Sequence, residues 1–361
     1  MARIEFYHID PAEKTAIFTE IATQKGMKPF AVEKDWWVSR TLEIIFQMPI
    51  AAHLVFKGGT SLSKAWKLIN RFSEDIYLAI DTAFFGFKGE LGKNQRDKLR
   101  KAAGVYTTGT FFEDLKQGFE TKGFMELDFV VIEAKDSDQD PRVLEIYYPN
   151  VIKPDSEYLL PRVQIEISCR SLREPFSVQR FGALVDEYYA GKEFADSLFE
   201  VPTVNAERTF LEKLFLLHEE FHRPMEKMRV DRLSRHLYDI YHLTKAGIAA
   251  NTINDKELYE TIVSHRYKFS RLGEVDYNLH NPKTLNPIPP QEVIADWKTD
   301  YAKMKEVMIY EEKKPSFDDL INNLMGLRKQ LQALDRQFES NFQPPITNHQ
   351  PPITNHQQPK K

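Results

Sequence analysis

The chain has little cysteine, no long apolar run and no apolar stretch near residue 1. Its one cysteine, Cys169, cannot form an intrachain disulfide, which excludes the disulfide-stabilised secreted classes. A membrane helix needs about 18 consecutive apolar residues, and Glu43, Gln47 and His53 interrupt the longest candidate. The N-terminal stretch MARIEFYHIDPAEK contains no apolar segment of the signal-peptide kind. We therefore expect a cytoplasmic protein that does not enter the membrane.

The chain also lacks a strong positive charge and a P-loop. The net charge is −4, so a polynucleotide would have to be bound by a local patch. The pattern Gly-x4-Gly-Lys-Ser/Thr does not occur, which disfavours kinase-type and GTPase chemistry. What is present is a hydrophobic content of 42% in 361 residues, enough for about two domains with cores of their own.

The most informative stretch runs from Leu54 to Ile80. A short apolar strand, Leu54–Phe56, is followed by Gly58 and Gly59 and by a helix predicted over 62–69. A second strand is predicted over 73–80. Glycines let a backbone approach a phosphate closely, and a helix start offers free N–H groups. Taken alone, a Gly-Gly turn of this kind is also common without any function.

Asp75 lies on the polar face of the second predicted strand. Residues two apart on a strand share a face, about 6.6–7 Å from one another. Acids at positions 75 and 77 could therefore hold two divalent metal ions, as phosphoryl-transfer sites do. Position 77 is a tyrosine, and a phenol with a pKa of about 10 is a poor ligand for magnesium.

The remaining pattern predicts three more strands and a helical C-terminal part. The strands are predicted over 126–134, 142–148 and 162–168, and residues 170–201 are predicted to connect them to the helices with one short helix. Helices are predicted over 10–24, 31–47, 94–103, 111–123, 206–222, 228–246, 256–267, 290–310 and 316–340. The tail repeats QPPITNH, a polar, proline-rich composition that predicts disorder over 341–361.

Several charged groups allow a plain interpretation beside a functional one. The helix over 94–103 is basic, either as a solvated face or as a surface that follows RNA phosphates. The acidic stretch 136–140 reads as a turn rather than a calcium loop. Glu33-Lys34-Asp35 reads as the solvated first turn of its helix. Lys213 reads as a surface lysine, and Asp231, Arg235 and Asp239 as an ion-pair ladder spaced four apart.

Together these motifs resemble the minimal nucleotidyltransferases of the DNA polymerase β superfamily, in particular the AbiEii/AbiGii family of abortive-infection and toxin–antitoxin proteins. That pattern is Gly-Gly/Ser, a helix, then Asp-hydrophobic-Asp/Glu on a strand. The chain has Gly58-Gly59-Thr60-Ser61-Leu62-Ser63-Lys64 and then Phe72-Ser73-Glu74-Asp75-Ile76-Tyr77. The Glu33-Lys34-Asp35 triplet, Lys213 and the stretch from Arg235 to Tyr241 also match, so the resemblance covers about 30–335.

The resemblance implies an α+β fold: a nucleotidyltransferase domain with a small mixed sheet (1–200) and a helical bundle (201–340) that completes the active-site cleft. It implies that NTP is bound by Gly58, Gly59, Thr60, Ser61, Lys64 and Lys213. Magnesium or manganese would be held at Asp75, position 77 and Glu166, although Glu166 could equally be an ordinary polar-face residue. Asp75, Lys213 and Asp239 would be the catalytic set, with Lys213 neutralising the leaving pyrophosphate and Asp239 orienting Lys213 or the acceptor hydroxyl.

The resemblance further implies a toxin that transfers NMP from NTP to RNA, with the tRNA 3′ end as the leading acceptor, and an antitoxin encoded nearby. Tyr77 departs from the family pattern and leaves a second interpretation open, a nucleotide-binding pseudoenzyme without catalysis. A third is a helical RNA-binding protein, because Arg229, Arg232 and Arg235 recur at helical spacing. That third interpretation leaves Gly58, Gly59 and Asp75 unexplained.

Overall fold

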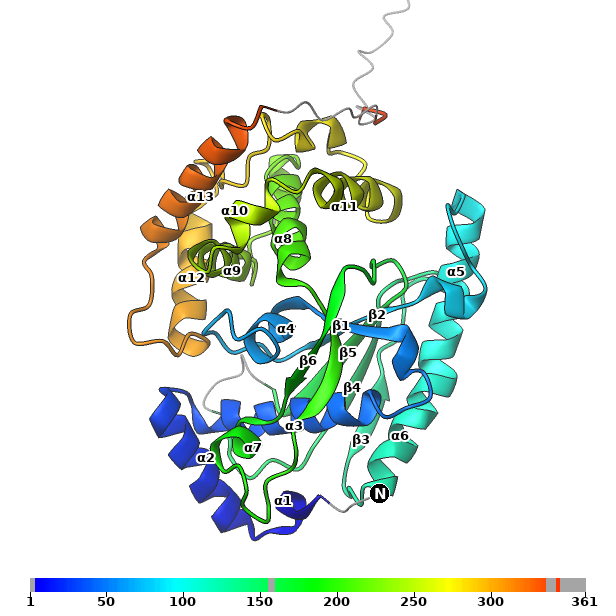
Figure 1. Ribbon diagram of the computed structural model, residues 1–361, viewed down its shortest axis with the longest axis vertical. Coiled ribbons are helices and arrows are strands. Elements are labelled where there is room, and N and C mark those ends of the chain that lie inside the picture. The colour runs from blue at the N-terminus through cyan, green and yellow to red at the C-terminus, as the bar shows by residue number, and fades with distance from the viewer. Residues whose placement is uncertain (1–3, 155–159, 336–341, 345–361) are drawn as a thin grey trace, which may run out of the picture.

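The computed structural model describes residues 4–154, 160–335 and 342–344. Figure 1 shows a mixed sheet flanked by helices in its lower half and a group of helices above, with α4 between them. This arrangement confirms the α+β fold class. Within the described ranges, no helix has both the length and the apolar character needed to cross a bilayer.

The sheet has seven strands in the order β3-β4-β5-β2-β1-β7-β6. Two neighbouring pairs, β1 with β7 and β2 with β5, are parallel, and the other pairs are antiparallel. The strands are β1 (Leu54–Lys57), β2 (Ile76–Ile80), β3 (Asp128–Val131), β4 (Arg142–Tyr147), β5 (Arg162–Ser168), β6 (Phe176–Phe181) and β7 (Phe199–Val204).

Two of these strands lie in the segment that was predicted to be a connection, so that prediction is wrong for β6 and β7. The reason is visible in β7, which contains Pro202 opposite Val178 of β6. A proline has no backbone N–H to donate to a neighbouring strand. A proline inside an apolar run therefore argues against a strand when only the sequence is considered. The short helix predicted in the same segment is present as α7 (Leu184–Tyr188).

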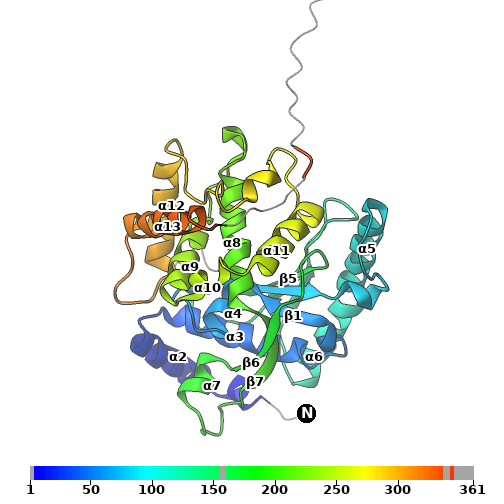
Figure 2. The ribbon, with the colours of Figure 1, turned by 45° about the horizontal axis from the view of Figure 1, so that its top comes forward.

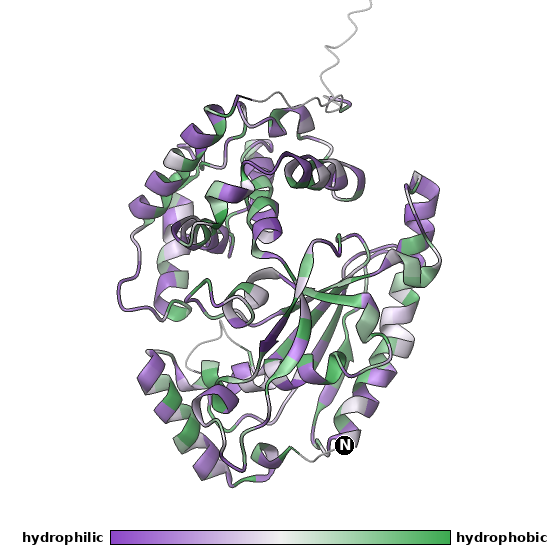
Figure 3. Ribbon diagram, in the orientation of Figure 1, coloured by the Kyte–Doolittle hydropathy of each residue, from purple (hydrophilic) through white to green (hydrophobic). Residues whose placement is uncertain are grey.

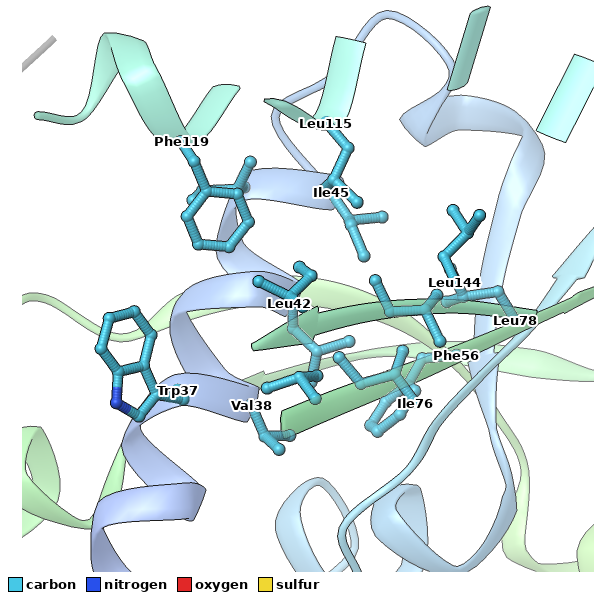
Figure 4. Close-up of a cluster of buried hydrophobic side chains, with 14 of the residues drawn as sticks. Trp37, Val38, Leu42, Ile45, Phe56, Ile76, Leu78, Leu115, Phe119 and Leu144 are labelled. Atoms are coloured by element: carbon cyan, nitrogen blue, oxygen red, sulfur yellow. The ribbon is translucent and has the colours of Figure 1, made fainter. Parts of the chain in front are cut away.

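The strand register separates an apolar face of the sheet from a polar one. Tyr77 lies opposite Lys57 on β1 and opposite Glu166 on β5, so these three side chains share one face. The other face packs against α3, where Figure 4 shows Val38 and Leu42 of the helix beside Phe56, Ile76 and Leu78 of the strands. Figure 3 likewise shows the central strands largely in the hydrophobic colour.

The helices of the sheet half mostly confirm the prediction, with added short elements. They are α1 (Glu5–His8), α2 (Pro11–Lys25), α3 (Pro29–Ile45), α4 (Gly58–Lys64), α5 (Lys93–Tyr106) and α6 (Phe112–Thr121). A π-helical turn at Thr107–Phe111 joins α5 to α6, and 3-10 turns lie at Ala51–His53 and Thr82–Phe85.

The helical half follows β7 and surrounds a second hydrophobic cluster (Figure 2). Leu62 and Ile69, on and just after α4, belong to that cluster rather than to the one beneath the sheet. The division into domains near residue 200 stays a prediction. The helices are α8 (Ala206–Glu220), α9 (Ser234–Lys245), α10 (Ile248–Thr252), α11 (Lys256–Phe269), α12 (Ile294–Val307) and α13 (Phe317–Gln332), with 3-10 turns at Met225–Lys227 and Tyr277–His280.

The helix predicted over 62–69 and the strand predicted over 73–80 are misplaced. The helix begins earlier, at Gly58, and ends at Lys64, and β2 begins only at Ile76. The chain between them is extended because it pairs with a distant segment: Phe72 N donates to Met308 O at 2.8 Å, and Tyr310 N donates to Asn70 O at 3.1 Å. Such long-range pairing cannot be read from local periodicity.

Two further boundaries and the tail also need correction. The helix predicted over 228–246 begins only at Ser234, and the last helix ends at Gln332 rather than near residue 340. The tail predicted to be disordered begins with an anchored segment, since Phe342 N and O both hydrogen-bond the side chain of Asn278. The rest of that prediction, over 345–361, lies outside the described residues.

Candidate active site

The two glycines after β1 are required by the side chains that lie against them. Gly58 has φ of +88°, and a Cβ there would lie 2.9 Å from the ring of Tyr77. A Cβ on Gly59 would lie 2.5 Å from the Arg71 guanidinium. Only glycine tolerates both the left-handed backbone at position 58 and this close approach. The Gly-Gly turn is therefore packed directly against β2 and against the loop that precedes it.

The polar residues of α4 tie this turn to the same loop. The Thr60 hydroxyl lies 2.6 Å from the carbonyl oxygen of Asp75, and the Ser61 hydroxyl donates to Gly58 O at 2.8 Å. Lys64, predicted to bind nucleotide, instead forms a buried ion pair with Asp35 of α3. Its ammonium group thus already has a carboxylate partner, and a role toward nucleotide stays a prediction for Lys64.

Asp75, Tyr77 and Glu166 form one group at the start of β2 and on β5. Burial raises the pKa of Asp75 and of Glu166. The neighbouring Glu74 raises the pKa of Asp75 further, and Asp75 raises the pKa of Glu166. Burial and the carboxylates of Glu166 and Asp75 hold the pKa of the Tyr77 phenol well above its usual value, so Tyr77 is protonated. Arg235 of α9 opposes these shifts and hydrogen-bonds the phenol.

This donor set does not fit a two-metal centre. Hard divalent cations prefer several carboxylate oxygens, and Tyr77 supplies a protonated phenol between two carboxylates. The Arg235 charge beside all three groups would also repel a cation. Across the described ranges, no group of three or more His, Cys, Asp or Glu side chains is placed to hold a metal ion. The adjacent Glu74 carboxylate is already paired with two cations, Lys34 at Oε2 and Arg232 at Oε1.

The second half of the site is a buried cluster around Asp239 of α9. Arg71 grips this carboxylate with two parallel hydrogen bonds, Nε to Oδ1 at 2.7 Å and Nη2 to Oδ2 at 2.8 Å. Lys213 of α8 approaches Oδ2 at 2.9 Å. Arg71 and Lys213 hold the pKa of Asp239 well below its usual value, against burial, which would raise it. The predicted ion-pair ladder of Asp231, Arg235 and Asp239 is therefore wrong. Asp231 precedes α9, and Asp239 pairs with Arg71 and Lys213 from other parts of the chain.

His236 is a further neighbour of Lys213. The Lys213 ammonium lies 3.4 Å from Nδ1 of His236. Burial and the positive charges of Lys213 and Arg235 hold the pKa of His236 well below its usual value, so the imidazole is neutral and Nδ1 accepts from the ammonium. Burial lowers the pKa of Lys213, while Asp239 raises it.

Arg71 joins the two halves of the site, and the sequence analysis did not identify it. Its guanidinium lies against Gly59 and at the same time binds Asp239, which binds Lys213. The predicted residues Gly59, Asp239 and Lys213 are thereby linked in one continuous set of contacts. No sequence pattern marks Arg71, because its partner lies 168 positions away.

The Glu33-Lys34-Asp35 triplet is buried, so its interpretation as a solvated first turn is wrong. Its three residues are 2%, 2% and 7% exposed because α3 lies between the sheet and other helices. Glu33 accepts from the backbone N–H of Val151 and Ile152. The triplet is therefore part of the framework behind the Asp75 loop.

Comparison with known proteins gives a family match over most of the chain. The family profile described as "Nucleotidyl transferase AbiEii toxin, Type IV TA system" matches residues 40–323. A search of curated protein sequences gives no match.

Solved structures similar to the chain include "MenT4, nucleotidyltransferase toxin Rv2826c from Mycobacterium tuberculosis H37Rv", with 16% identity, 91% of each chain covered and a TM-score of 0.45. JHP933 from Helicobacter pylori has 14% identity over 85% of this chain and 93% of its own, with a TM-score of 0.41. A putative nucleotidyltransferase from H. pylori has 13% identity over 85% of this chain and 96% of its own, with a TM-score of 0.40.

Proposed function

Because this chain belongs to the AbiEii family of nucleotidyltransferase toxins from type IV toxin–antitoxin systems, we propose that it is a nucleotidyltransferase toxin that moves NMP from an NTP to an RNA acceptor. The leading acceptor is the 3′ end of tRNA, and the setting is the cytoplasm, with an antitoxin encoded nearby as partner. In this chain the transfer is impaired by Tyr77.

The observation that carries the proposal is the continuous contact from Gly59 through Arg71 and Asp239 to Lys213. It brings the glycine turn and a buried lysine together from parts of the chain that lie far apart in sequence. Phosphoryl transfer depends on positioning and on neutralising charge rather than on covalent chemistry by the protein. A lysine held beside a glycine turn suits the phosphates of an NTP.

The residues of this site have defined parts in the proposal. Asp239 holds the Lys213 ammonium in one orientation, 2.9 Å away, and Lys213 neutralises the charge that develops on the leaving pyrophosphate. Gly58 and Gly59 let the Tyr77 ring and the Arg71 guanidinium approach the turn closely, where larger residues would clash. In this family, magnesium or manganese supplies charge neutralisation. The set of Asp75, Tyr77 and Glu166 does not fit such a metal ion.

Tyr77 favours a second candidate, a nucleotide-binding pseudoenzyme. The phenol is protonated and bound by Arg235, so it cannot act as the second acid. Mutation of even the outer-shell partners of metal ligands typically costs about 10–100-fold in metal affinity or activity, so loss of a ligand is expected to be costly too. The two candidates differ only in residual activity: an impaired toxin retains slow transfer, and a pseudoenzyme binds NTP without any transfer.

The test is transfer from labelled NTPs to total tRNA in the presence of magnesium. The chain is compared with Tyr77→Asp, with Tyr77→Phe as the matched control that removes the hydroxyl without adding an acid, and with Tyr77→Asp/Asp75→Ala. We expect strong labelling only by Tyr77→Asp. No labelling by any variant, together with no NTP binding, refutes both candidates.

A further inference from the structure

The segment that leads into Asp75 is held at both ends by buried charges. At one end Arg71 is bound to Asp239 of the helical half. At the other end Glu74, which directly precedes Asp75, is 6% exposed and receives two cations. Lys34 of α3 binds Oε2, and Nη2 of Arg232 binds Oε1 at 2.8 Å.

Arg232 reaches Glu74 from an unusual backbone conformation. It lies two residues before α9 with φ of +59°, in the left-handed region that a non-glycine residue adopts at a cost. Asp300 of α12 holds this conformation, since Oδ1 accepts from Arg232 N at 2.8 Å and Oδ2 accepts from Ser234 N at 3.0 Å. Strain that is kept in place by dedicated contacts suggests a function for the side chain it orients.

We propose that Arg232 is a positioning residue: through Glu74 it fixes the Asp75 carboxylate relative to Lys213. The inference rests on the proposed function and goes beyond it. Lys213 lies on α8 and Arg232 just before α9, whereas Glu74 and Asp75 lie just before β2. The Arg232–Glu74 contact therefore helps to set the distance between the Asp75 carboxylate and the Lys213 ammonium. A displacement of about 1 Å at a reacting group can cost about 100-fold in rate.

Removing this side chain should leave the fold intact. Arg232 is 34% exposed at its side chain, whereas Lys34, at 3%, is the buried partner that continues to neutralise Glu74. The bonds from Asp300 go to backbone N–H groups and do not depend on the arginine side chain. Arg232→Gln thus removes the ion pair with Glu74 while the backbone bonds from Asp300 remain.

Arg229 provides a matched control three residues away. It also pairs with a buried glutamate, Nη2 to Oε2 of Glu220 at 2.6 Å, and its backbone N–H also has a carboxylate acceptor. Glu220 lies at the end of α8 and not on the Asp75 loop. Arg229→Gln therefore reports the general effect of losing an arginine–glutamate pair in this region.

The first experiment is hydrogen–deuterium exchange on the full chain, followed over peptides that span 70–77. Arg232→Gln should speed exchange there by on the order of 10-fold, Arg232→Lys should recover part of the protection, and Arg229→Gln should leave it unchanged. Unchanged exchange in Arg232→Gln, or equal loosening in both glutamine variants, overturns the proposal.

The second experiment measures kinetics in the Tyr77→Asp background. Arg232→Gln should lower kcat by about 10- to 100-fold and leave the KM for NTP within about 3-fold, because it disturbs geometry rather than nucleotide binding. An unchanged kcat overturns the positioning role. If the Tyr77→Asp parent transfers no nucleotide, the proposed function fails, while the exchange comparison still decides whether Arg232 holds the segment.

Discussion

Replacement of Asp239 by asparagine should destabilise the protein strongly, because two buried cations depend on this carboxylate. Asp239 is fully buried, Arg71 is 2% exposed and Lys213 is 7% exposed. Asparagine keeps the shape but removes the charge that compensates both. Removal of one member of a buried ion pair typically costs about 3–5 kcal/mol, because the partner charge is left uncompensated.

That free energy corresponds to a clear change in melting temperature. For chains of this size, each kcal/mol shifts Tm by roughly 2–4 °C, so a fall on the order of 10 °C is expected. Asp231→Asn is the matched control, since Asp231 is exposed and lies outside α9. Urea unfolding followed by circular dichroism measures both variants. A loss within about 1 kcal/mol for Asp239→Asn would refute the reasoning about uncompensated charge.

The same substitution has a defined pH dependence. Arg71 and Lys213 depress the pKa of Asp239 in the folded state. A depressed carboxyl pKa contributes stability above the unfolded-state value of about 3.9, and this contribution is lost as the pH falls through the lower folded-state value. The difference in the free energy of unfolding between the wild-type chain and Asp239→Asn should therefore be constant above about pH 5. This difference should become smaller only below about pH 4.

Three other substitutions test separate parts of the framework. Gly58→Ala should cost at least about 1–2 kcal/mol in urea unfolding, because of its positive φ and the Tyr77 ring 2.9 Å away; a neutral effect would contradict the steric account. Burial raises the pKa of Glu33 to about 7, so its contribution to stability is full below about pH 4.5 and is lost as the pH rises toward 7. Glu33→Gln should therefore flatten the pH dependence of the free energy of unfolding between these values. An unchanged pH dependence would contradict this role of Glu33. Asp35→Asn should cost about 3 kcal/mol, because it leaves the buried Lys64 ammonium unpaired, and a chain as stable as the wild type would show that Lys64 has another partner.

Local motifs predicted much of the site, because their chemistry depends on residues close together in the chain. The Gly58-Gly59 turn, the strand around Tyr77 and the strand that carries Glu166 can be read from turn residues and alternation. The family resemblance, which the profile match over 40–323 confirms, added Lys213 and Asp239. The structure then places Glu166 opposite Tyr77, and its role stays a prediction.

Contacts between distant segments could not be predicted from the sequence. Arg71, Arg232 and Lys34 find their partners 168, 158 and 40 positions away, and no periodicity marks them. The burial of Lys34 also reversed an expectation, because charged residues in the first turn of a helix are usually solvated. Pro202 concealed β7 for a similar reason, since a strand with a proline is stable there only through its neighbours in the sheet.

The hypothesis that Arg229, Arg232 and Arg235 form one RNA-binding helix face is also wrong. Helix α9 begins at Ser234, so the first two arginines precede it. Arg229 binds Glu220, Arg232 binds Glu74, and Arg235 faces the Asp75 and Tyr77 group. Each arginine therefore has a partner within the fold, and the spacing in sequence was coincidental.

The most direct test of the account is nucleotide transfer to tRNA by the chain and by Tyr77→Asp, measured side by side with labelled NTPs and magnesium. We predict that Tyr77→Asp transfers nucleotide about 10- to 100-fold faster than the chain with Tyr77, and that Asp75→Ala abolishes this gain. Equal transfer by the two proteins would contradict the claim that Tyr77 disables the site.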